Sequence, residues 1–224
     1  MNQNGVSWLN IYTRIGAYWA HDGNMRRPHA LLTSGQHASE YFDSSQLTQD
    51  PDLLADAAED LFKFLFWRHR IYSTAGCVVG PPTGGTKLAE AIGLRMMDQH
   101  HCSCLNPVPI KRDEGGRKSM DFEPGDCDAI RGQNVLLCDD VLTTGGSIQL
   151  LEDAFIRTGG TILPVILVLV NRSGLPMLRV RTIISLIDRP ENSWEPDDCH
   201  YCREGSAAIR PKDEGNWERL TAHY

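Results

Sequence analysis

From residue 75 onward, short apolar runs alternate with helical segments, and glycine marks the junctions between them. The apolar runs cover 77–79, 108–110, 135–138, 162–170 and 182–187, and helical periodicity covers about 84–99 and 145–158. Because the runs lack strict polar alternation, they indicate parallel strands with helices on both faces. The pattern predicts a doubly wound, mostly parallel α/β sheet. Ligands of such a sheet bind beyond the carboxyl ends of its strands, in the loops after Val79, Ile110, Cys138 and Val170.

The first half of the chain and one polar segment predict smaller elements. Residues 6–19 place apolar side chains at helical spacing, and 29–35 and 40–43 form two extended pieces around a Ser-Gly turn. Pro51 begins an amphipathic helix that ends near a basic segment, as suits the negative end of a helix. Residues 107–131 are polar and rich in glycine and charge, and we interpret them as a long mobile loop.

Composition excludes several classes of function. The 224 residues include 22 Lys+Arg and 29 Asp+Glu, a net charge of −7. An acidic chain is poorly suited to nucleic acid, so an anionic ligand must depend on a local group of residues. The longest apolar stretch, 162–170, contains Pro164 and falls short of the roughly 20 residues of a membrane helix. The N-terminus lacks a secretory pattern, so we expect a cytoplasmic protein with free thiols.

The segment from Val135 to Ser147 carries the most chemical information. A buried strand runs into two adjacent carboxylates, Asp139 and Asp140, and then into a Thr-Thr-Gly-Gly-Ser stretch that begins a helix. Backbone N–H groups, hydroxyls and glycines at a helix N-terminus form a cradle for a phosphate. The carboxylates suit hydroxyl groups or a metal instead, and a sugar phosphate would supply hydroxyls. The alternative is an ordinary turn with a fortuitous acidic pair.

A second loop of the same type follows the strand at 77–79. Gly80 to Ala89 leads through Pro-Pro-Thr-Gly-Gly into a helix. By itself this stretch could be a simple turn, but beside another phosphate-type loop it indicates a second phosphate site. Lys87 in the first turn of that helix could point toward the phosphate or into solvent.

Together, the two loops resemble the pyrophosphate loop and the PRPP-binding motif of type I phosphoribosyltransferases, where PRPP is phosphoribosyl pyrophosphate. The resemblance implies that Asp139 and Asp140 hold the ribose 2′- and 3′-hydroxyls. It also implies a set of PRPP-binding residues, the first seven of them around the 5′-phosphate. They are Val141, Leu142, Thr143, Thr144, Gly145, Gly146, Ser147, Thr83, Gly84, Gly85 and Lys87.

The flanking segments resemble orotate phosphoribosyltransferases in particular. Residues 31–43 are similar to the segment that forms a hood over the base, and 168–174 to the strand that ends at the pyrimidine. Residues 199–205, followed by Pro211-Lys212, are similar to the C-terminal end of one branch of these enzymes. The resemblance implies orotate contacts from Thr143, Arg172, Tyr41 and Phe42, with Arg172 pairing with the orotate carboxylate. A surface arginine after a strand is the alternative.

The sequence departs from the family pattern at several positions. Asn171 stands where the family usually has Asp, and Thr33 stands where one branch has a PRPP-contacting Lys. The family has a mobile loop whose basic residues, often with a His, close over pyrophosphate. This chain offers four cations and no His there, and a solvated charged loop is the alternative. The candidate catalytic cations are Lys111, Arg112, Arg117 and Lys118.

The resemblance implies a type I phosphoribosyltransferase fold with a small hood subdomain made from the N-terminal segment and the C-terminal tail. We expect residues 1–50 to form an N-terminal helix and hood segment and 51–190 to form the PRPP-binding core. Residues 191–224 should form a tail that packs on the hood or on the core. The implied reaction is transfer of ribose 5-phosphate from PRPP to orotate, which yields orotidine 5′-phosphate and pyrophosphate. The implied cofactor is Mg²⁺, held through PRPP and water with no direct protein ligand, and the implied assembly is a homodimer.

Two other functions remain open at this point. One is transfer to a purine or another base. The other is a non-catalytic PRPP-sensing regulator that binds nucleic acid, although the chain is acidic and has no appended helix-turn-helix.

The cysteines leave a metal site open. Cys199 and Cys202, with His200, or the cluster at 100–104 could contribute ligands to zinc. A structural zinc site needs four ligands, and the sequence does not show that these groups meet. A redox pair is the other interpretation of Cys-x-x-Cys, but this one lies in a polar tail rather than at the start of a helix. The sequence therefore favours free thiols.

Overall fold

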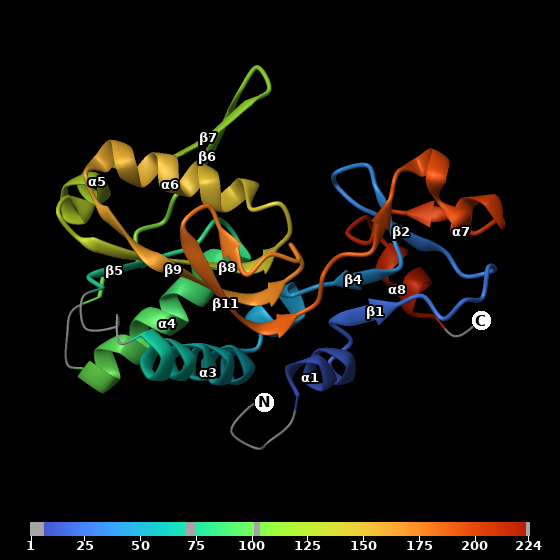
Figure 1. Cartoon of the computed structure of the whole chain (residues 1–224), viewed down its shortest axis with the longest axis horizontal. Helices are drawn as coiled ribbons and strands as arrows, with labels where there is room; N and C mark the ends of the chain where they lie inside the picture. The colour runs from blue at the N-terminus through green and yellow to red at the C-terminus, as the bar shows by residue number, and fades with distance from the viewer. Residues whose placement is uncertain (1–6, 70–74, 101–103, 223–224) are drawn as a thin grey trace.

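The computed structural model describes residues 7–69, 75–100 and 104–222 and has two parts, a larger α/β core and a smaller subdomain beside it (Figure 1). The smaller part is built on a four-stranded sheet of β2 (His29–Leu31), β3 (His37–Ala38), β12 (Ser193–Trp194) and β13 (Ala208–Ile209). We call this sheet and its connecting segments the hood.

The core contains a five-stranded sheet in the order β10-β11-β9-β8-β5. Its four parallel strands are β5 (Cys77–Val79), β8 (Asn134–Leu142), β9 (Thr161–Asn171) and β11 (Arg181–Asp188). The short β10 (Met177–Leu178) is antiparallel to β11 at the edge. The apolar runs of β8 and β9 are buried almost throughout, as expected for strands covered on both faces. The predicted doubly wound, mostly parallel sheet is therefore confirmed.

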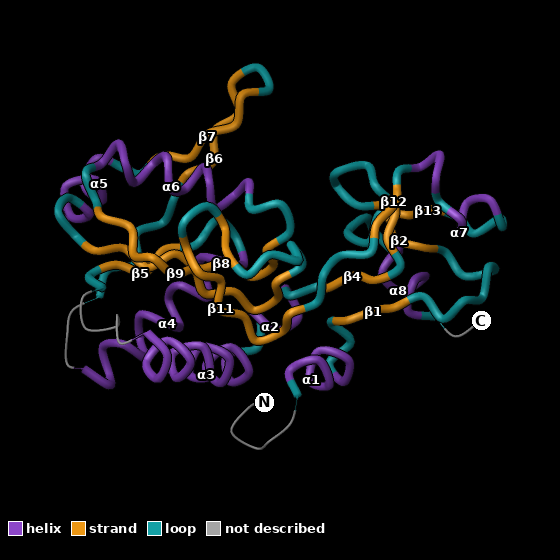
Figure 2. The backbone as a smooth tube through the Cα atoms, in the orientation of Figure 1, coloured by secondary structure: helices purple, strands orange, loops and turns teal. Residues whose placement is uncertain are grey.

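Helices cover both faces of this sheet (Figures 1 and 2). On one side lie α3 (Pro51–His69) and α4 (Gly84–His100), and on the other α5 (Pro124–Ile130) and α6 (Gly146–Thr158). Neighbouring residues of β8 enter different hydrophobic clusters: Leu136 packs with the α3 and α4 side, and Leu137 with the α6 side. The strand thus contributes alternate side chains to both halves of the core.

The N-terminal helix is shorter than predicted. The structure has α1 at Trp8–Arg14, followed by β1 (Tyr18–Ala20), which pairs with β4 (Glu40–Phe42). Gly16 has a φ of +70°, a conformation that commonly ends a helix, and the apolar residues after it belong to a strand. The Trp8 indole nitrogen donates a hydrogen bond of 3.0 Å to Asp60 and so attaches α1 to α3.

The predicted long loop at 107–131 is also wrong, because the segment folds into a hairpin and a helix. Strands β6 (Ile110–Glu114) and β7 (Arg117–Asp121) pair only with each other, and α5 follows. Gly115 and Gly116 have φ of +63° and +89°, the positive values that a two-residue hairpin turn requires. Ile110 therefore begins a projecting hairpin rather than ending a strand of the core sheet (Figure 1).

The hood joins the two ends of the chain. His29 of β2 lies beside Ala208 of β13 in parallel register, and His37 of β3 lies opposite Trp194 of β12. The tail also contains a 3-10 turn at Pro196–Asp198, α7 (His200–Arg203) and α8 (Asn216–Thr221). Strands from residues 29–38 and 193–209 thus share one sheet.

An ion pair links β11 of the core to β4. Arg189, just after β11, forms a two-point ion pair with Glu40 of β4, and this ion pair lowers the pKa of the Glu40 carboxyl.

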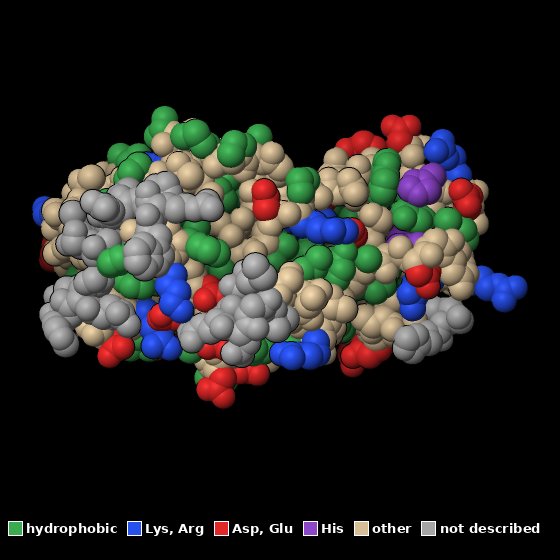
Figure 3. Space-filling view, turned by 60° about the horizontal axis from the view of Figure 1, so that its bottom comes forward, with side chains coloured by type: hydrophobic (Ala, Val, Ile, Leu, Met, Phe, Trp, Pro, Cys, Tyr) green, Lys and Arg blue, Asp and Glu red, His purple; other side chains and the backbone are tan. Residues whose placement is uncertain are grey.

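Figure 3 shows acidic, basic and hydrophobic side chains interspersed on one face, with histidines on the hood half. Among the described residues, no helix is both long enough and apolar enough to span a bilayer.

Candidate active site

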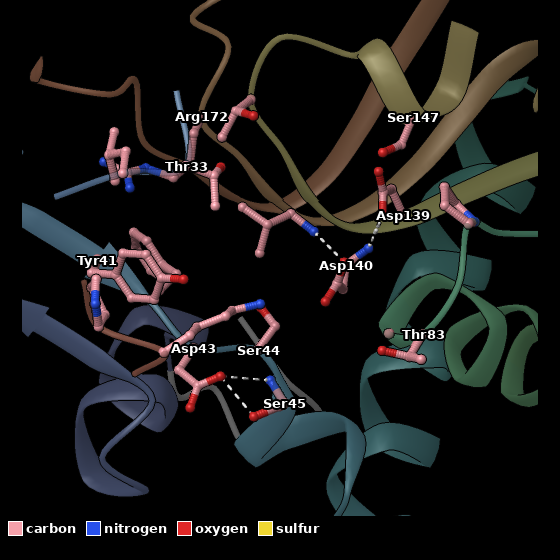
Figure 4. Close-up of a pocket in the computed structure, with 18 of the residues that line it drawn as sticks. Thr33, Tyr41, Asp43, Ser44, Ser45, Thr83, Asp139, Asp140, Ser147 and Arg172 are labelled. Atoms are coloured by element: carbon pink, nitrogen blue, oxygen red, sulfur yellow. Dashed lines mark hydrogen bonds between the residues drawn. The ribbon is translucent and has the colours of Figure 1, made fainter. Parts of the chain in front are cut away.

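A cleft of about 1040 Å³ lies between the core and the hood, beyond the carboxyl ends of the parallel strands. Figure 4 shows the two sides facing each other across it, with Asp139, Asp140, Thr83 and Ser147 on one side and Tyr41, Thr33 and Arg172 on the other. Most of the residues named from the sequence line this cleft. They are Thr83, Gly84, Lys87, Lys111, Lys118, Asp139, Asp140, Val141, Thr143, Thr144, Ser147, Tyr41, Phe42 and Arg172.

The two aspartates lie in the last part of β8, which continues through Leu142. Asp139 is 7% exposed, and its Oδ1 accepts a 2.9 Å hydrogen bond from the backbone N–H of Asp140. Burial, and then the neighbouring Asp140, raise the pKa of Asp139 well above its ordinary value. The free protein therefore disfavours the Asp139 carboxylate, and a ligand that brings hydroxyl donors or positive charge would stabilise it.

The loop after β5 approaches the acidic pair closely. A Cβ atom added to Gly84 would lie 2.1 Å from Oδ2 of Asp140, so a side chain at this position would displace that carboxylate. The peptide bond between Pro82 and Thr83 is cis. Gly85 is buried behind the loop and does not line the cleft. The glycine at position 84 thus lets the loop after β5 approach the acidic pair of β8 closely.

The start of α6 offers an uncapped helix N-terminus to the cleft. Gly145 occupies the N-cap position with a φ of +76° and provides no side-chain cap for the first N–H groups. Thr143 and Thr144 are exposed beside it. Unpaired N–H groups at the positive end of a helix bind phosphate well. The side chain of Leu142 instead packs in the core, and neither Gly145 nor Gly146 is among the residues that line the cleft.

The hairpin divides its cations between two faces. Lys111 lies opposite Met120 and Lys118 opposite Asp113, which places both lysines on one face, and both line the cleft. The Lys111 amine donates a 2.7 Å hydrogen bond to the carbonyl of Pro82 in the phosphate-type loop. Arg112 alternates with Lys111 along the strand and instead pairs with Asp121.

Arg117 is the second cation of the opposite face. It lies two positions along β7 from Ser119, the partner of Arg112, and does not line the cleft. The pleat of the hairpin therefore turns the two lysines toward the cleft and the two arginines away from it.

Arg172 follows β9 and is almost completely buried, with 3% exposed. Its backbone N–H donates to Leu142, and its Nη1 reaches both the Glu40 carbonyl and the Glu191 carboxylate at 3.3 Å. Among the described residues, Nε and Nη2 have no hydrogen-bond partner. Burial lowers the pKa of this guanidinium, although Glu191 and Glu40 oppose the change. A buried arginine with two unused donors at a cleft wall suits an anionic ligand.

Two aromatic residues complete the hood side of the cleft. The Phe42 ring lies beneath the guanidinium of Arg172, with 5.5 Å between the ring centroid and Cζ. Tyr41 contacts the Trp217 ring edge-on at 5.9 Å. Burial, followed by Asp43 and Asp140, raises the pKa of Tyr41 to about 12, so its hydroxyl remains a donor at neutral pH. Flat aromatic surfaces beside an arginine suit a planar, anionic ring.

Asn171, at the end of β9, is absent from the cleft lining. Its side-chain amide donates to the Leu175 carbonyl and to Asp188, each at 3.0 Å, and accepts from Ser173. These bonds fix the turn that holds Arg172. Asn171, which stands where the family usually has Asp, thus makes its hydrogen bonds within the turn.

Sequence reasoning missed several residues of the cleft. Ser45 and Thr48 come from α2 (Ser45–Thr48), and Glu191 follows β11. Arg210 and Lys212 come from the tail, where only Pro211-Lys212 had given a signal. With them, the lining holds six basic and five acidic side chains, although the whole chain carries −7. The cleft lining is thus nearly balanced in charge although the chain as a whole is acidic, so an anionic ligand depends on where the individual cations lie.

Comparison with known proteins extends these observations. No protein-family model matches the chain. Orotate phosphoribosyltransferase of Pelotomaculum thermopropionicum is 29% identical over 205 residues, which cover 88% of this chain and 95% of the relative. That of Desulforamulus reducens is 27% identical over 210 residues, which cover 91% and 94%. The crystal structure of orotate phosphoribosyltransferase from Aeropyrum pernix superposes with a TM-score of 0.57 at 24% identity, over 80% of this chain and 92% of that one.

This chain has the orotate phosphoribosyltransferase fold. The resemblance that the sequence motifs indicated is confirmed, since the similarity to proteins of that name extends over most of the chain. The type I phosphoribosyltransferase fold is confirmed by the superposition.

Proposed function

We propose that this protein is an enzyme that transfers ribose 5-phosphate from PRPP to orotate, forming orotidine 5′-phosphate and pyrophosphate in pyrimidine synthesis. The observation that carries the proposal is the pair of unused N–H groups of Arg172, in the wall of the same cleft as the acidic pair. A guanidinium fork matches a carboxylate, and the carboxylate distinguishes orotate from uracil. The similarity to named orotate phosphoribosyltransferases supports the same acceptor.

PRPP would occupy the core side of the cleft. Its 5′-phosphate would lie at the N-terminus of α6, against the N–H groups and hydroxyls from Thr143 to Ser147. Asp139 and Asp140 would accept hydrogen bonds from the ribose hydroxyls. The pyrophosphate would lie against the loop at Thr83, within reach of Lys111 from the hairpin.

The reaction would proceed by displacement at the anomeric carbon. A ring nitrogen of orotate would form a bond to this carbon as the bond to pyrophosphate oxygen breaks, and the proton of that nitrogen would pass to the departing pyrophosphate or to solvent. Positive charge develops on the ribose during this step, so the carboxylates beneath it stabilise the transition state. Lys111 and Lys118 would neutralise the departing pyrophosphate, and closure of the hairpin would exclude water.

The oxygen donors of the cleft fit Mg²⁺. The lining contains carboxylates and hydroxyls but neither imidazole nor thiol among the described residues, and hard oxygen donors are those that Mg²⁺ prefers. When bound through phosphate oxygens and water, Mg²⁺ would offset negative charge on pyrophosphate. We also propose a homodimer, as the family resemblance implies, and a cytoplasmic location, as the sequence predicts.

The test is loss of orotate absorbance when the full chain is mixed with PRPP and Mg²⁺, with uracil, hypoxanthine and guanine offered in parallel. We expect turnover of orotate alone. Turnover of hypoxanthine or guanine instead would assign the protein to purine salvage. PRPP binding by calorimetry without turnover of any base would favour a sensor.

A further inference from the structure

Two histidines of the hood and two cysteines of the tail converge at one point outside the cleft. His29 lies in β2 and His37 in β3. Cys199 is the N-cap residue of the short helix α7, and Cys202 lies within that helix. One ligand atom from each lies within 4.8 Å of the other three. Among the described residues, this is the one group of three or more His, Cys, Asp or Glu side chains arranged to hold a metal ion. We propose that these four residues bind a structural zinc ion.

The distances among the four atoms match a tetrahedron around zinc. With bonds of about 2.0–2.1 Å to nitrogen and about 2.3 Å to sulfur, tetrahedral edges are about 3.3 Å between nitrogens and about 3.6 Å between nitrogen and sulfur. His29 Nε2 lies 3.0 Å from His37 Nδ1, 3.5 Å from Cys199 Sγ and 3.6 Å from Cys202 Sγ. Cys202 Sγ lies 3.3 Å from His37 Nδ1. These four edges are within about 0.3 Å of the values for zinc.

A hydrogen bond behind His29 aims its lone pair at this centre. The Ser206 hydroxyl donates to the Arg27 carbonyl at 2.7 Å, so its oxygen accepts from Nδ1 of His29 at 2.9 Å. With the proton on Nδ1, Nε2 carries a lone pair and faces the two thiols and His37. Metal-bound histidines typically have such a partner on the second ring nitrogen, which fixes the tautomer and the ring. His29 is therefore oriented as a ligand.

The ligand types select zinc over the other candidates. Two thiols and two imidazoles are the ligands of structural zinc sites, whereas Mg²⁺ requires oxygen. Cys199 and Cys202 are free thiols in the structure. A redox pair would need only the two cysteines and would leave unexplained why two buried imidazoles face the sulfur atoms. His29, His37 and Cys199 are buried, while Cys202 is exposed and leaves a path for the ion to enter.

The proposed ligand set differs from the zinc ligands that the sequence suggested. His200 is not part of the group, and its ring packs against Tyr201 at 4.0 Å. Of the cluster at 100–104, residues 101–103 lie outside the described part of the chain. The histidines come from two adjacent strands of the hood, 170 residues or so before the cysteines. Zinc there would tie the tail, with Arg210 and Lys212 of the cleft, to the strands that precede Tyr41.

The experiment begins with the metal content of the full chain, purified without a histidine tag and measured by mass spectrometry after incubation with Zn²⁺ and gel filtration. We expect one tightly held zinc per chain. Replacement of the zinc by Co²⁺ should give the thiolate charge-transfer band and the intense visible bands of tetrahedral cobalt. These two measurements need no variant and so do not depend on whether a variant folds.

Variants then assign the ligands. The double variant Cys199→Ser/Cys202→Ser should lose the zinc and the cobalt bands, and a chelator should lower the Tm of the unaltered protein but not of this variant. Cys127→Ser, at a partly buried thiol outside the group, is the matched control and should retain both. Protein without zinc after this incubation, a Cys199–Cys202 disulfide in it, or zinc retained by the double variant would overturn the proposal.

Discussion

Replacing Arg172 with methionine should damage orotate recognition far more than folding. The side chain holds two buried donors that the protein itself leaves unused, and we propose that orotate accepts both. A hydrogen bond to a charged group contributes about 1.5–3 kcal/mol. Loss of two such bonds would therefore cost about 3–6 kcal/mol, or roughly a 10²- to 10⁴-fold fall in kcat/KM for orotate.

The effect on stability should be small because two changes oppose each other. An unsatisfied buried donor costs about 1–3 kcal/mol, and methionine removes two such donors while it retains contact with the Phe42 ring. The same substitution loses the 3.3 Å hydrogen bond to the Glu40 carbonyl and the 3.3 Å ion pair with Glu191, whose side chain is 17% exposed and can turn toward water. We expect the free energy of unfolding to change by no more than about 1 kcal/mol.

The assay compares three quantities for Arg172→Met: kcat/KM for orotate, PRPP affinity by calorimetry, and Tm. Arg131→Met, at an exposed surface arginine, is the matched control and should change none of them. Arg172→Lys retains the charge without the fork and should lie between the two. An equal loss of PRPP affinity and orotate turnover, or a collapse in Tm, would refute the assignment of Arg172 to the acceptor.

Three further predictions concern the core side of the cleft. Gly84→Ala places a methyl group against the second aspartate and should lower kcat/KM for PRPP by roughly 10- to 100-fold, whereas Gly125→Ala, with open space at that position, should leave turnover unchanged. Asp139→Asn should raise the Tm of the free protein increasingly as pH rises. Because the pKa of Asp139 is raised in the folded protein, its carboxyl contributes fully to stability below pH 3.8, the ordinary pKa. This contribution is lost as the pH rises through the raised pKa, so an equal Tm gain at pH 4 and pH 8 would contradict the reasoning. Lys111→Ala should slow turnover by roughly 10²-fold, and Arg112→Ala by much less; a reversed order in steady-state rates would show that the hairpin pleat does not select the cation.

The core of the fold could be predicted because its sequence signals are local. Continuous apolar runs and glycine junctions identify strands that are buried on both faces, and the phosphate-type loops follow them directly along the chain. The sequence alone therefore places the acidic pair and the loop before α6 at the carboxyl ends of the parallel strands. Even the hairpin had a local signal, Gly115-Gly116, but its polar strands hid the alternation that marks a packed sheet.

The hood could not be predicted in the same way. Its strands are two or three residues long, too short for a periodic pattern, and their pairing joins segments from opposite ends of the chain. The same distance hid the match between the histidines and the cysteines, because sequence spacing gives no information on groups that meet only through tertiary packing. His200, adjacent in sequence, was a natural choice of ligand and lies outside the group.

The pairing of β13 with β2 bears on how the protein is made. A ribosome releases every strand of the core sheet before Ala208 and Ile209 emerge. The loops after β5 and β8 can therefore fold while the hood sheet still lacks β13. During that interval the nascent chain would have the site that we propose for the sugar phosphate but an unfinished wall on the side that we propose for the base. Under the proposed function, the last strand to be synthesised would therefore complete the half of the cleft that distinguishes one acceptor from another.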